Sequence, residues 1–200
     1  MESDKEIYIG QADASRHWEQ RLSPASEYFE LLRSLDETPE GKSLLDVGCA
    51  AGIEAEEFQK MGLLVDGVDI NEDLIKEAQE RLPESHFVVA SAEALPQKDE
   101  SYDIVFSINA LFYTELEKSI AEFCRVLKPG GRGIISFDTE IINLDEGAVF
   151  HSDSVDHLEK VLTDAGAEIE KVGLEEQRID MEPFEHQHTF HKIVFKKVGK

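Results

Sequence analysis

The chain has 200 residues, of which 41% are hydrophobic; this is enough for the core of one domain and argues against a disordered chain. Its 43 acidic residues outnumber its 20 basic residues, and the formal net charge of −23 repels nucleic acid and anionic membranes at long range. We therefore expect a small-molecule partner, no nucleic acid and no membrane, although a local basic pocket is compatible with this composition.

The cysteine content and the length of the apolar runs bear on the cellular compartment of the protein. Cys49 and Cys124 are too few for a disulfide framework or a cysteine metal site, and they suit a reducing environment. Residues 1–6 are charged rather than signal-like, and no apolar run reaches the length of a transmembrane helix. These features predict a cytoplasmic protein.

The first predicted element is a helix over residues 24–35, which follows a polar segment with scattered aromatic side chains. Its apolar side chains recur at i, i+3, i+4 and i+7: Tyr28, Leu31, Leu32 and Leu35. Ser23 is suited to cap this helix, and Pro24 is suited to its first turn.

Strands and helices then alternate along the chain. Strands are predicted at residues 44–47, 63–68, 86–90, 102–108 and 133–137, and helices at residues 53–61, 72–82, 115–127 and 153–165. Two further strands, 168–174 and 189–198, have no helix between them and should pair as a hairpin. The pattern predicts an α/β fold, doubly wound, with a mainly parallel sheet and one antiparallel strand.

The most informative stretch is an apolar strand that ends in an acid and a loop of very small residues. Such a loop lets the backbone approach a nucleotide-like ligand, because glycine leaves room and the next helix offers unpaired N–H groups. Asp46, Gly48, Ala50 and Gly52 resemble the first motif, D-x-G-x-G-x-G, of class I S-adenosylmethionine-dependent methyltransferases, with Ala50 in place of the middle glycine. The dinucleotide pattern G-x-G-x-x-G would instead place its last glycine at Ile53.

The resemblance implies a set of donor contacts. The loop, including Cys49, would hold the methionine part of S-adenosylmethionine, with Asp46 facing its amino group. The segment around Asp69 and Ile70 resembles the second-strand motif, whose acid accepts hydrogen bonds from the ribose hydroxyls. For Asp69, a helix N-cap or first-turn acid is the alternative.

The adenine would lie against the segment after the third strand. Ser91 stands where the family often has aspartate, and a hydroxyl accepts a hydrogen bond from the adenine amino group more weakly than a carboxylate does. Part of the adenine contact would therefore be made by the backbone of Ala92 and Glu93. A solvated loop acid is the alternative for Glu93. Ser107, at the end of the fourth strand, belongs to the segment that resembles the floor under the reacting methyl group.

The family resemblance covers roughly residues 40–140 and includes the turn at residues 127–131, which is similar to the L-x-P-G-G turn before the fifth strand. It implies a Rossmann-like sheet of seven strands in the order 3-2-1-4-5-7-6, with strand 7 antiparallel and helices on both faces. We divide the single domain, residues 1–200, into a helical cover (1–38), a donor-binding core (40–140) and a C-terminal helix with a hairpin (141–200).

The acceptor side of the site is less determined. Methyl transfer from a sulfonium is an in-line displacement, so alignment supplies much of the catalysis and a base is needed only for some acceptors. No catalytic residue is assigned; Trp18, Asn109 and Tyr113 are candidates for acceptor contacts. His17 is a candidate base, with a surface or packing role as the favoured alternative.

Two C-terminal features complete the sequence-based predictions. Residues 139–150 form only a modest segment after the fifth strand, which predicts a lightly covered pocket. His186 and His188 would share a strand face, and with Glu182 or Glu185 they could bind a metal. An exposed polar strand end is the favoured interpretation, so no metal is expected.

The predicted function is methyl transfer from S-adenosylmethionine to a small-molecule acceptor, with S-adenosylhomocysteine as the product. Two alternatives stay open at this point. One is a non-catalytic S-adenosylmethionine-binding or regulatory protein of the same fold. The other is a methyltransferase that acts on a protein, for which the acidic surface would suit a basic partner.

Overall fold

The computed structural model describes residues 40–111, 114–143, 148–151, 154–181 and 184–198, and five positions before them, at 28, 30, 31, 33 and 34. Four of those earlier positions, Tyr28, Glu30, Leu31 and Arg33, are helical and fall within the helix predicted from the sequence. None of the described helices is long and apolar enough to span a membrane.

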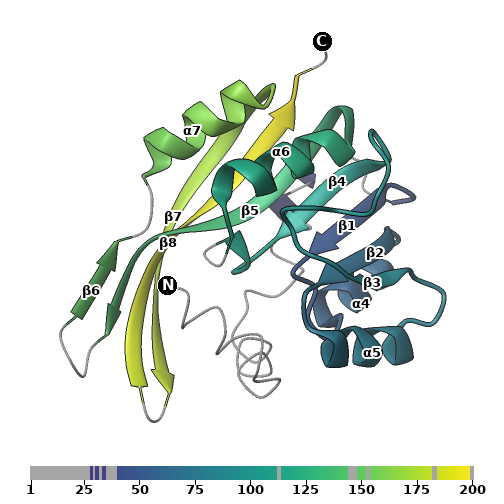
Figure 1. Ribbon diagram of the computed structural model, residues 1–200, viewed down its shortest axis with the longest axis horizontal. Coiled ribbons are helices and arrows are strands. Elements are labelled where there is room, and N and C mark those ends of the chain that lie inside the picture. Colours follow the sequence, from purple (N-terminus) through teal and green to yellow (C-terminus); the bar gives the residue numbers. More distant parts are fainter. Residues whose placement is uncertain are drawn as a thin grey trace.

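One sheet organises the molecule (Figure 1). Its strands lie in the order β3-β2-β1-β4-β5-β8-β7, and a further strand, β6, pairs with β5. Their bounds are β1 (Ser43–Val47), β2 (Leu64–Asp69), β3 (Phe87–Val89), β4 (Tyr102–Ser107), β5 (Leu127–Asn143), β6 (Ala148–His151), β7 (Ala167–Met181) and β8 (Phe184–Lys197). Neighbours from β3 to β5 are parallel, and β8 is antiparallel to both β5 and β7. With β7 and β8 counted as the sixth and seventh strands, the predicted order 3-2-1-4-5-7-6 is confirmed.

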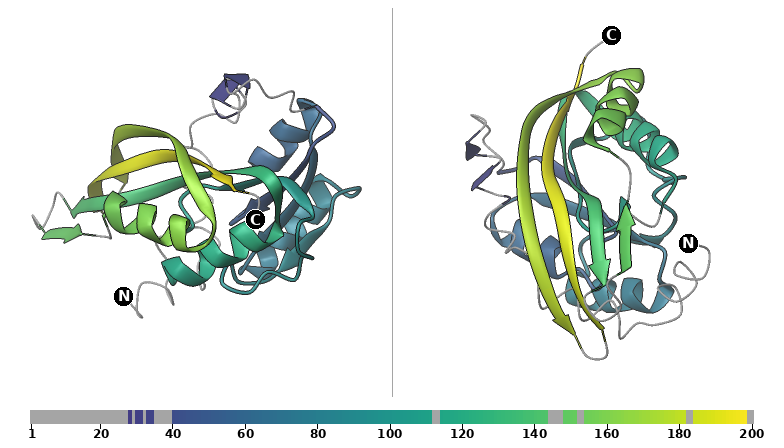
Figure 2. Two further views of the ribbon diagram at one scale, coloured as in Figure 1. Left: turned by 90° about the horizontal axis from the view of Figure 1, so that it is seen from above. Right: turned by 90° about the vertical axis from the view of Figure 1, so that its left-hand side faces the viewer.

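Helices cover both faces of this sheet (Figure 2). They are α4 (Ile53–Lys60), α5 (Glu72–Arg81), α6 (Leu116–Val126) and α7 (Val155–Asp164). The helices pack into two apolar clusters, one for each pair of helices. The helices α6 and α7 contribute Ile120, Phe123, Leu158 and Leu162 to one cluster, and α4 and α5 contribute Phe58, Ile75 and Ala78 to the other. The consecutive β5 residues Ile134 and Ile135 belong to different clusters, so the clusters lie on opposite faces.

The main departure from the predicted elements is the length of the last strands. The sequence predicts strands at 133–137, 168–174 and 189–198, whereas β5 runs from Leu127 to Asn143, β7 runs to Met181, and β8 begins at Phe184. The predicted turn at residues 127–131 is therefore part of β5. The antiparallel register continues to the far end, where Asn143 pairs with His186 and Met181 with Phe184. The predicted boundaries were wrong because these extensions are rich in polar residues, so the apolar pattern stops before the backbone pairing does.

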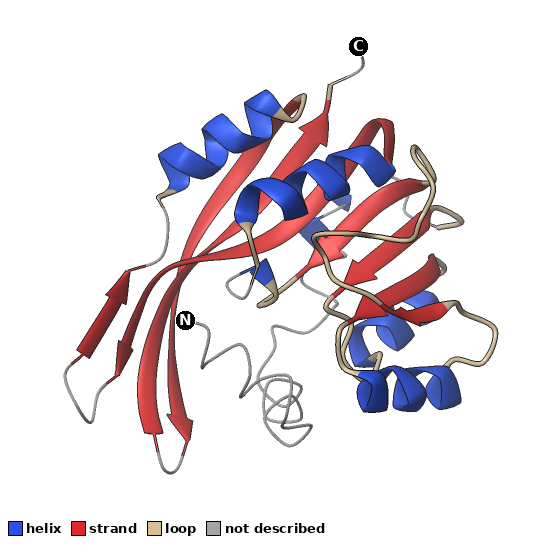
Figure 3. Ribbon diagram, in the orientation of Figure 1, coloured by secondary structure: helices blue, strands red, loops and turns tan. Residues whose placement is uncertain are grey.

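The segment after β5 is also more structured than expected. Residues 139–150 are not a simple connection, because they include the end of β5 and most of β6. The two strands pair antiparallel, with Asn143 opposite Ala148 at one end and Glu140 opposite His151 at the other. The strands β6, β5, β8 and β7 together form an antiparallel ribbon that extends beyond the parallel part of the sheet (Figure 3). Because β5 is parallel to β4, the ribbon projects from the edge where the parallel strands have their carboxyl ends.

Candidate donor-binding site

The small-residue loop after β1 is held against β2. The N–H groups of Gly48 and Cys49 both donate to the carbonyl of Val68, at 2.7 and 3.1 Å, and the Gly52 N–H donates to the Cys49 carbonyl at 2.9 Å. Gly48 has φ 83°, and a Cβ there would lie 2.6 Å from the Cβ of Ala110. Both the backbone conformation and the close approach therefore require glycine at position 48.

Ala50 occupies the position of the middle glycine of the family motif. Its φ of 45° lies in the left-handed region, which costs an L-residue about 1–2 kcal/mol. The Ala50 N–H donates to Asp69 Oδ2 at 3.0 Å, and this bond supports the strained conformation. The loop thus keeps a glycine-like conformation with an alanine.

Asp69, at the end of β2, connects two loops through its carboxylate. Oδ2 accepts from Ala50, and Oδ1 accepts from the Asn71 N–H at 2.8 Å. Burial raises the pKa of Asp69, and the backbone N–H groups of Asn71, Ala50 and Ile70 oppose that rise. Each oxygen can accept a further hydrogen bond, so the carboxylate keeps capacity for a ligand hydroxyl.

The N-cap alternative for Asp69 was wrong. Asn71 caps α5, and its Oδ1 accepts from the N–H groups of Asp73 and Leu74 at 3.0 and 3.2 Å. The sequence-based predictions did not include Asn71, although an asparagine directly before Glu72 and Asp73 is typical of a helix start.

Asp46, at the end of β1, is the buried acid beside this loop. Its side chain is 3% exposed, and its Oδ2 has no hydrogen-bond partner among the described residues. Burial raises the pKa of Asp46 well above its ordinary value, and the nearby carboxylates of Glu54 and Asp69 raise it further. A buried acceptor without a donor is unfavourable in the free protein and suits a ligand that brings a cationic N–H group.

The end of β4 supplies two more candidate residues. Ser107 is fully buried, and its Oγ has no hydrogen-bond partner among the described residues. Asn109 has φ 57°; its N–H donates to Ser136 Oγ at 2.7 Å, and that hydroxyl lies 3.3 Å from Asn109 Oδ1. Asn109 is thus fastened to β5 by a serine that no sequence pattern had indicated.

The segment after β3 is held by its own polar side chains. Ser91 Oγ accepts from the Glu93 N–H at 3.2 Å, and Glu93 Oε1 accepts from the Glu115 N–H at 3.0 Å. Glu115 is the N-cap residue of α6. Glu93 is therefore not simply a solvated loop acid, because its carboxylate connects this segment to the start of α6. Ala92 beside it is half-buried.

The structure brings most of the predicted residues to one edge. The glycine loop, Asp69 and Ser107 follow or end the parallel strands β1, β2 and β4, and open α/β sheets bind ligands at that edge. Ile70 is an apolar side chain exposed directly after Asp69. The candidates His17, Trp18 and Tyr113 lie outside the described residues.

The histidines of β8 are spread along one strand. In the strand register, His186 pairs with Asn143 and Ile179, and His188 pairs with Ile141 and Gln177. Within the described part of the chain, no three His, Cys, Asp or Glu side chains gather in a way that could hold a metal ion. Glu182 lies outside the described residues.

Comparison with known proteins agrees with this geometry. Residues 45–135 match a family model described as a methyltransferase domain. This stretch of the chain is similar to a methyltransferase domain. The sheet topology confirms the predicted fold, and the match supports the predicted family and its donor, S-adenosylmethionine.

Two similar proteins illustrate the range of the family. The demethylmenaquinone methyltransferase of Renibacterium salmoninarum is 34% identical over 97 residues, which are 48% of this chain and 41% of that protein. The malonyl-[acyl-carrier protein] O-methyltransferase of Salmonella typhimurium is 28% identical over 127 residues, which are 63% of this chain and 50% of that protein. The chain therefore spans half or less of the length of these two relatives.

A solved structure shares the fold over a larger part of the chain. It is the geranyl diphosphate C-methyltransferase from Streptomyces coelicolor in complex with Mg²⁺, geranyl diphosphate and S-adenosylhomocysteine. The TM-score is 0.64 at 16% identity, covering 86% of this chain and 79% of that one.

Proposed function

We propose that this methyltransferase domain transfers a methyl group from S-adenosylmethionine to a small-molecule acceptor. The observation that carries the proposal is the pair of buried acids, Asp46 and Asp69, at the ends of adjacent parallel strands beside the glycine loop. The names of the two relatives, which refer to demethylmenaquinone and to malonyl-[acyl-carrier protein], support a metabolite acceptor.

The residues present fit the donor. Asp46 would pair with the amino group of its methionine part, because Oδ2 is a buried acceptor that lacks a donor among the described residues. Asp69 would accept from the ribose hydroxyls, and the exposed side chain of Ile70 would pack against the nucleoside. The backbone of Ser91, Ala92 and Glu93 would lie along the adenine. The bound donor supplies an activated methyl group on its sulfonium.

Alignment is then the main task of the protein. Ser107 and Asn109 come from the end of β4 and the loop after it, at the same edge as the donor residues, and Asn109 is held in place by Ser136. We propose Asn109, together with Trp18 and Tyr113, as acceptor contacts. No general base is assigned among the described residues, and the candidate base His17 lies outside them.

Titration calorimetry with S-adenosylmethionine and S-adenosylhomocysteine tests donor binding, and a panel of acceptors with labelled donor tests transfer. We expect saturable binding of both ligands, with mutual competition, and methyl transfer to at least one small acceptor. Absence of binding by either ligand would overturn the proposal.

The panel also separates the alternatives. Donor binding without transfer to any acceptor would favour the non-catalytic protein, for which Ala50 and Ser91 are the motivating departures from the family motif. Transfer to basic proteins alone would favour the protein methyltransferase.

We also propose a cytoplasmic location and the single-domain division given above. Both described cysteines, Cys49 and Cys124, are free and buried. Burial raises the pKa of the Cys124 thiol to about 11, so it is poorly reactive. Free thiols of this kind are typical of proteins from reducing compartments.

A further inference from the structure

Ser136 is a polar residue in an apolar, buried stretch of β5. Its neighbours Ile134, Ile135 and Phe137 are buried, and Ser136 itself is 1% exposed. A hydroxyl group in such surroundings is unfavourable unless it is hydrogen-bonded, whereas an alanine would fill nearly the same space without that requirement. The partner of the hydroxyl therefore indicates what a serine does at this position.

The Ser136 hydroxyl bonds to a single residue, Asn109, in two ways. Its Oγ accepts from the Asn109 N–H at 2.7 Å and donates to Asn109 Oδ1 at 3.3 Å. Among the described residues, the Ser136 side chain has no other hydrogen bond. One buried group thus holds both the backbone and the side chain of a residue that lies two positions after the end of β4.

The backbone of Asn109 needs such support. Its φ of 57° lies in the left-handed region, which asparagine adopts more readily than most residues but which only glycine adopts without a steric cost. The two bonds from Ser136 stabilise this conformation and with it the turn over residues 108–111. Leu111, at the end of the turn, is buried in the same apolar cluster as α6.

The turn places Ala110 against the donor loop. A Cβ built on Gly48 would lie 2.6 Å from the Cβ of Ala110, so the methyl group of Ala110 occupies the space beside Gly48. The N–H of Gly48 donates to the Val68 carbonyl of β2 at 2.7 Å. Because β1 lies between β2 and β4, the loop that follows β1 is supported from both neighbouring strands.

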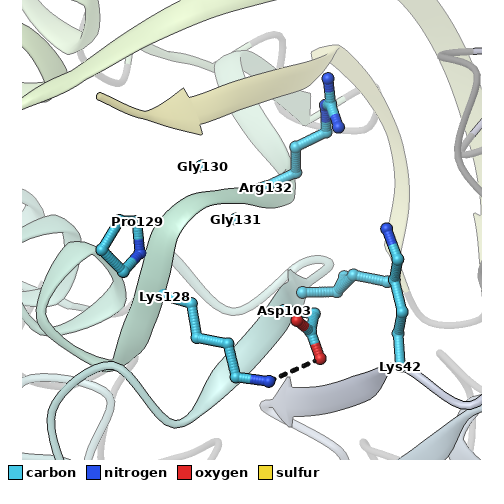
Figure 4. Close-up of a pocket in the computed structure, with 8 residues that line it drawn as sticks. Lys42, Asp103, Lys128, Pro129, Gly130, Gly131 and Arg132 are labelled. Carbon is cyan, nitrogen blue, oxygen red and sulfur yellow. Dashed lines mark hydrogen bonds and ion pairs between the residues drawn. The ribbon is translucent and has the colours of Figure 1, made fainter. Parts of the chain in front are cut away.

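The strand that carries Ser136 is itself well fixed relative to β4. Ser107, the last residue of β4, pairs with Ile135, directly before Ser136. At the opposite, amino edge of the sheet, Lys128 Nζ of β5 donates to Asp103 Oδ2 of β4 at 2.8 Å (Figure 4). Ser136 therefore reaches the turn from a strand that is connected to β4 at both edges.

We propose that Ser136 is a positioning residue of the donor site: its hydroxyl holds Asn109 so that Ala110 lies against Gly48 and supports the donor loop. Ser136 acts through these residues rather than by contact with the donor. The inference rests on the proposed function, because it concerns the affinity for S-adenosylmethionine and its product. Without the hydroxyl, the turn adopts other conformations, and the donor affinity falls with the fraction of molecules in which the loop is supported.

Calorimetry with S-adenosylhomocysteine, thermal unfolding and hydrogen exchange of the Asn109 N–H test the proposal on Ser136→Ala. Ser119→Ala is the matched control, because Ser119 is also fully buried but its Oγ has no hydrogen-bond partner among the described residues. Lys128→Met is a second control, which removes the ion pair with Asp103 at the other edge. Ser136→Ala combined with Asn109→Gly tests for rescue, because glycine adopts the left-handed conformation without a partner.

We expect Ser136→Ala to bind S-adenosylhomocysteine about three- to tenfold more weakly than the parent. Its Asn109 N–H should exchange about tenfold faster or more. Ser119→Ala and Lys128→Met should stay within about twofold of the parent affinity, even where Lys128→Met lowers the unfolding temperature. Adding Asn109→Gly to Ser136→Ala should recover most of the lost affinity, which a loss of stability alone would not explain.

The outcomes separate this inference from the proposed function. If the parent binds S-adenosylhomocysteine and Ser136→Ala binds it equally well, this inference alone is overturned. An equal loss of affinity in Lys128→Met, or no recovery on adding Asn109→Gly, would also overturn it, because the effect would then be one of general stability. If the parent does not bind S-adenosylhomocysteine, the proposed function fails and this inference fails with it.

Discussion

At the scale of single residues, the unpaired carboxylate oxygen of Asp46 is the feature with the sharpest consequence. Replacing the acid by asparagine removes a buried ionisable group whose Oδ2 has no hydrogen-bond partner among the described residues. We expect Asp46→Asn to unfold at the same or a higher temperature than the parent. Its affinity for S-adenosylhomocysteine should fall about 10- to 100-fold, since a hydrogen bond to a charged group contributes about 1.5–3 kcal/mol. Thermal unfolding and calorimetry measure the two effects; unchanged affinity would remove Asp46 from the donor site.

The raised pKa of Asp46 also predicts a pH dependence. In the free protein, ionisation of this buried acid costs stability as the pH rises from the unfolded pKa through the folded one. A cationic amino group favours the ionised form, so below the raised pKa of the free protein binding releases a proton, and donor affinity should increase with pH up to that pKa. Calorimetry in buffers of different ionisation enthalpy detects the proton release. Asp46→Asn should abolish it, and an equal release in that variant would assign the proton to another group.

Gly48 provides a second test at a single position. Gly48→Ala combines a φ of 83° with a Cβ contact of 2.6 Å, so we expect a loss of about 2–5 kcal/mol in the free energy of unfolding. Gly41→Ala is the matched control, because Gly41 has φ 81° and a Cβ there would meet nothing within 4 Å. It should lose only about 1–2 kcal/mol and keep its donor affinity. Equal losses in urea unfolding would show that the contact with Ala110 is unimportant.

At the scale of elements, Arg125 connects α6 to residues 95–99, which follow the segment proposed to contact the adenine. Its guanidinium donates to the carbonyls of Gln97 and Leu95 at 2.8 and 2.9 Å and also pairs with Glu122 and Asp99. Glu122 in turn accepts from the Leu95 N–H at 2.7 Å. The connection between β3 and β4 is therefore ordered by one helix side chain and its partner rather than by a strand or helix of its own.

Arg125→Met should lower the free energy of unfolding by about 1–3 kcal/mol and speed amide hydrogen exchange at residues 95–99, because several carbonyls and carboxylates lose their donor. Lys118→Met, on the same helix, removes only an exposed pair with Glu115 and should cost less than about 1 kcal/mol. If the two variants lose equal stability and show equal exchange, the fastening role of Arg125 is wrong.

At the scale of the whole molecule, the net charge of −23 is a source of self-repulsion. Salt screens charges over about 10 Å at 0.1 M and about 3 Å at 1 M, so the unfolding temperature should rise as sodium chloride is added. A series at constant pH measures the rise, with sucrose as a non-ionic comparison. An unfolding temperature that falls with salt would show that attractive pairs outweigh the repulsion.

From the sequence alone we predicted the strand order, which the structure confirms, and a resemblance to one family with its donor. This information is local: the run of small residues from Gly48 to Gly52, the acids at two strand ends and the alternation of strand and helix patterns can each be recognised within a short window. The local sequence also favoured ribose binding for Asp69. It did not identify Asn71 as the N-cap of α5, because Asp69, two residues earlier, is of a residue type that also caps helices.

The tertiary structure alone decided the features that depend on distant partners. Glu93 reaches the N-terminus of α6, 22 residues on, and Asn109 pairs with Ser136, 27 residues on. The polar extensions of β5, β7 and β8 become strands because each pairs with a neighbouring strand. The stabilisation from this pairing cannot be predicted from the residues of one segment alone.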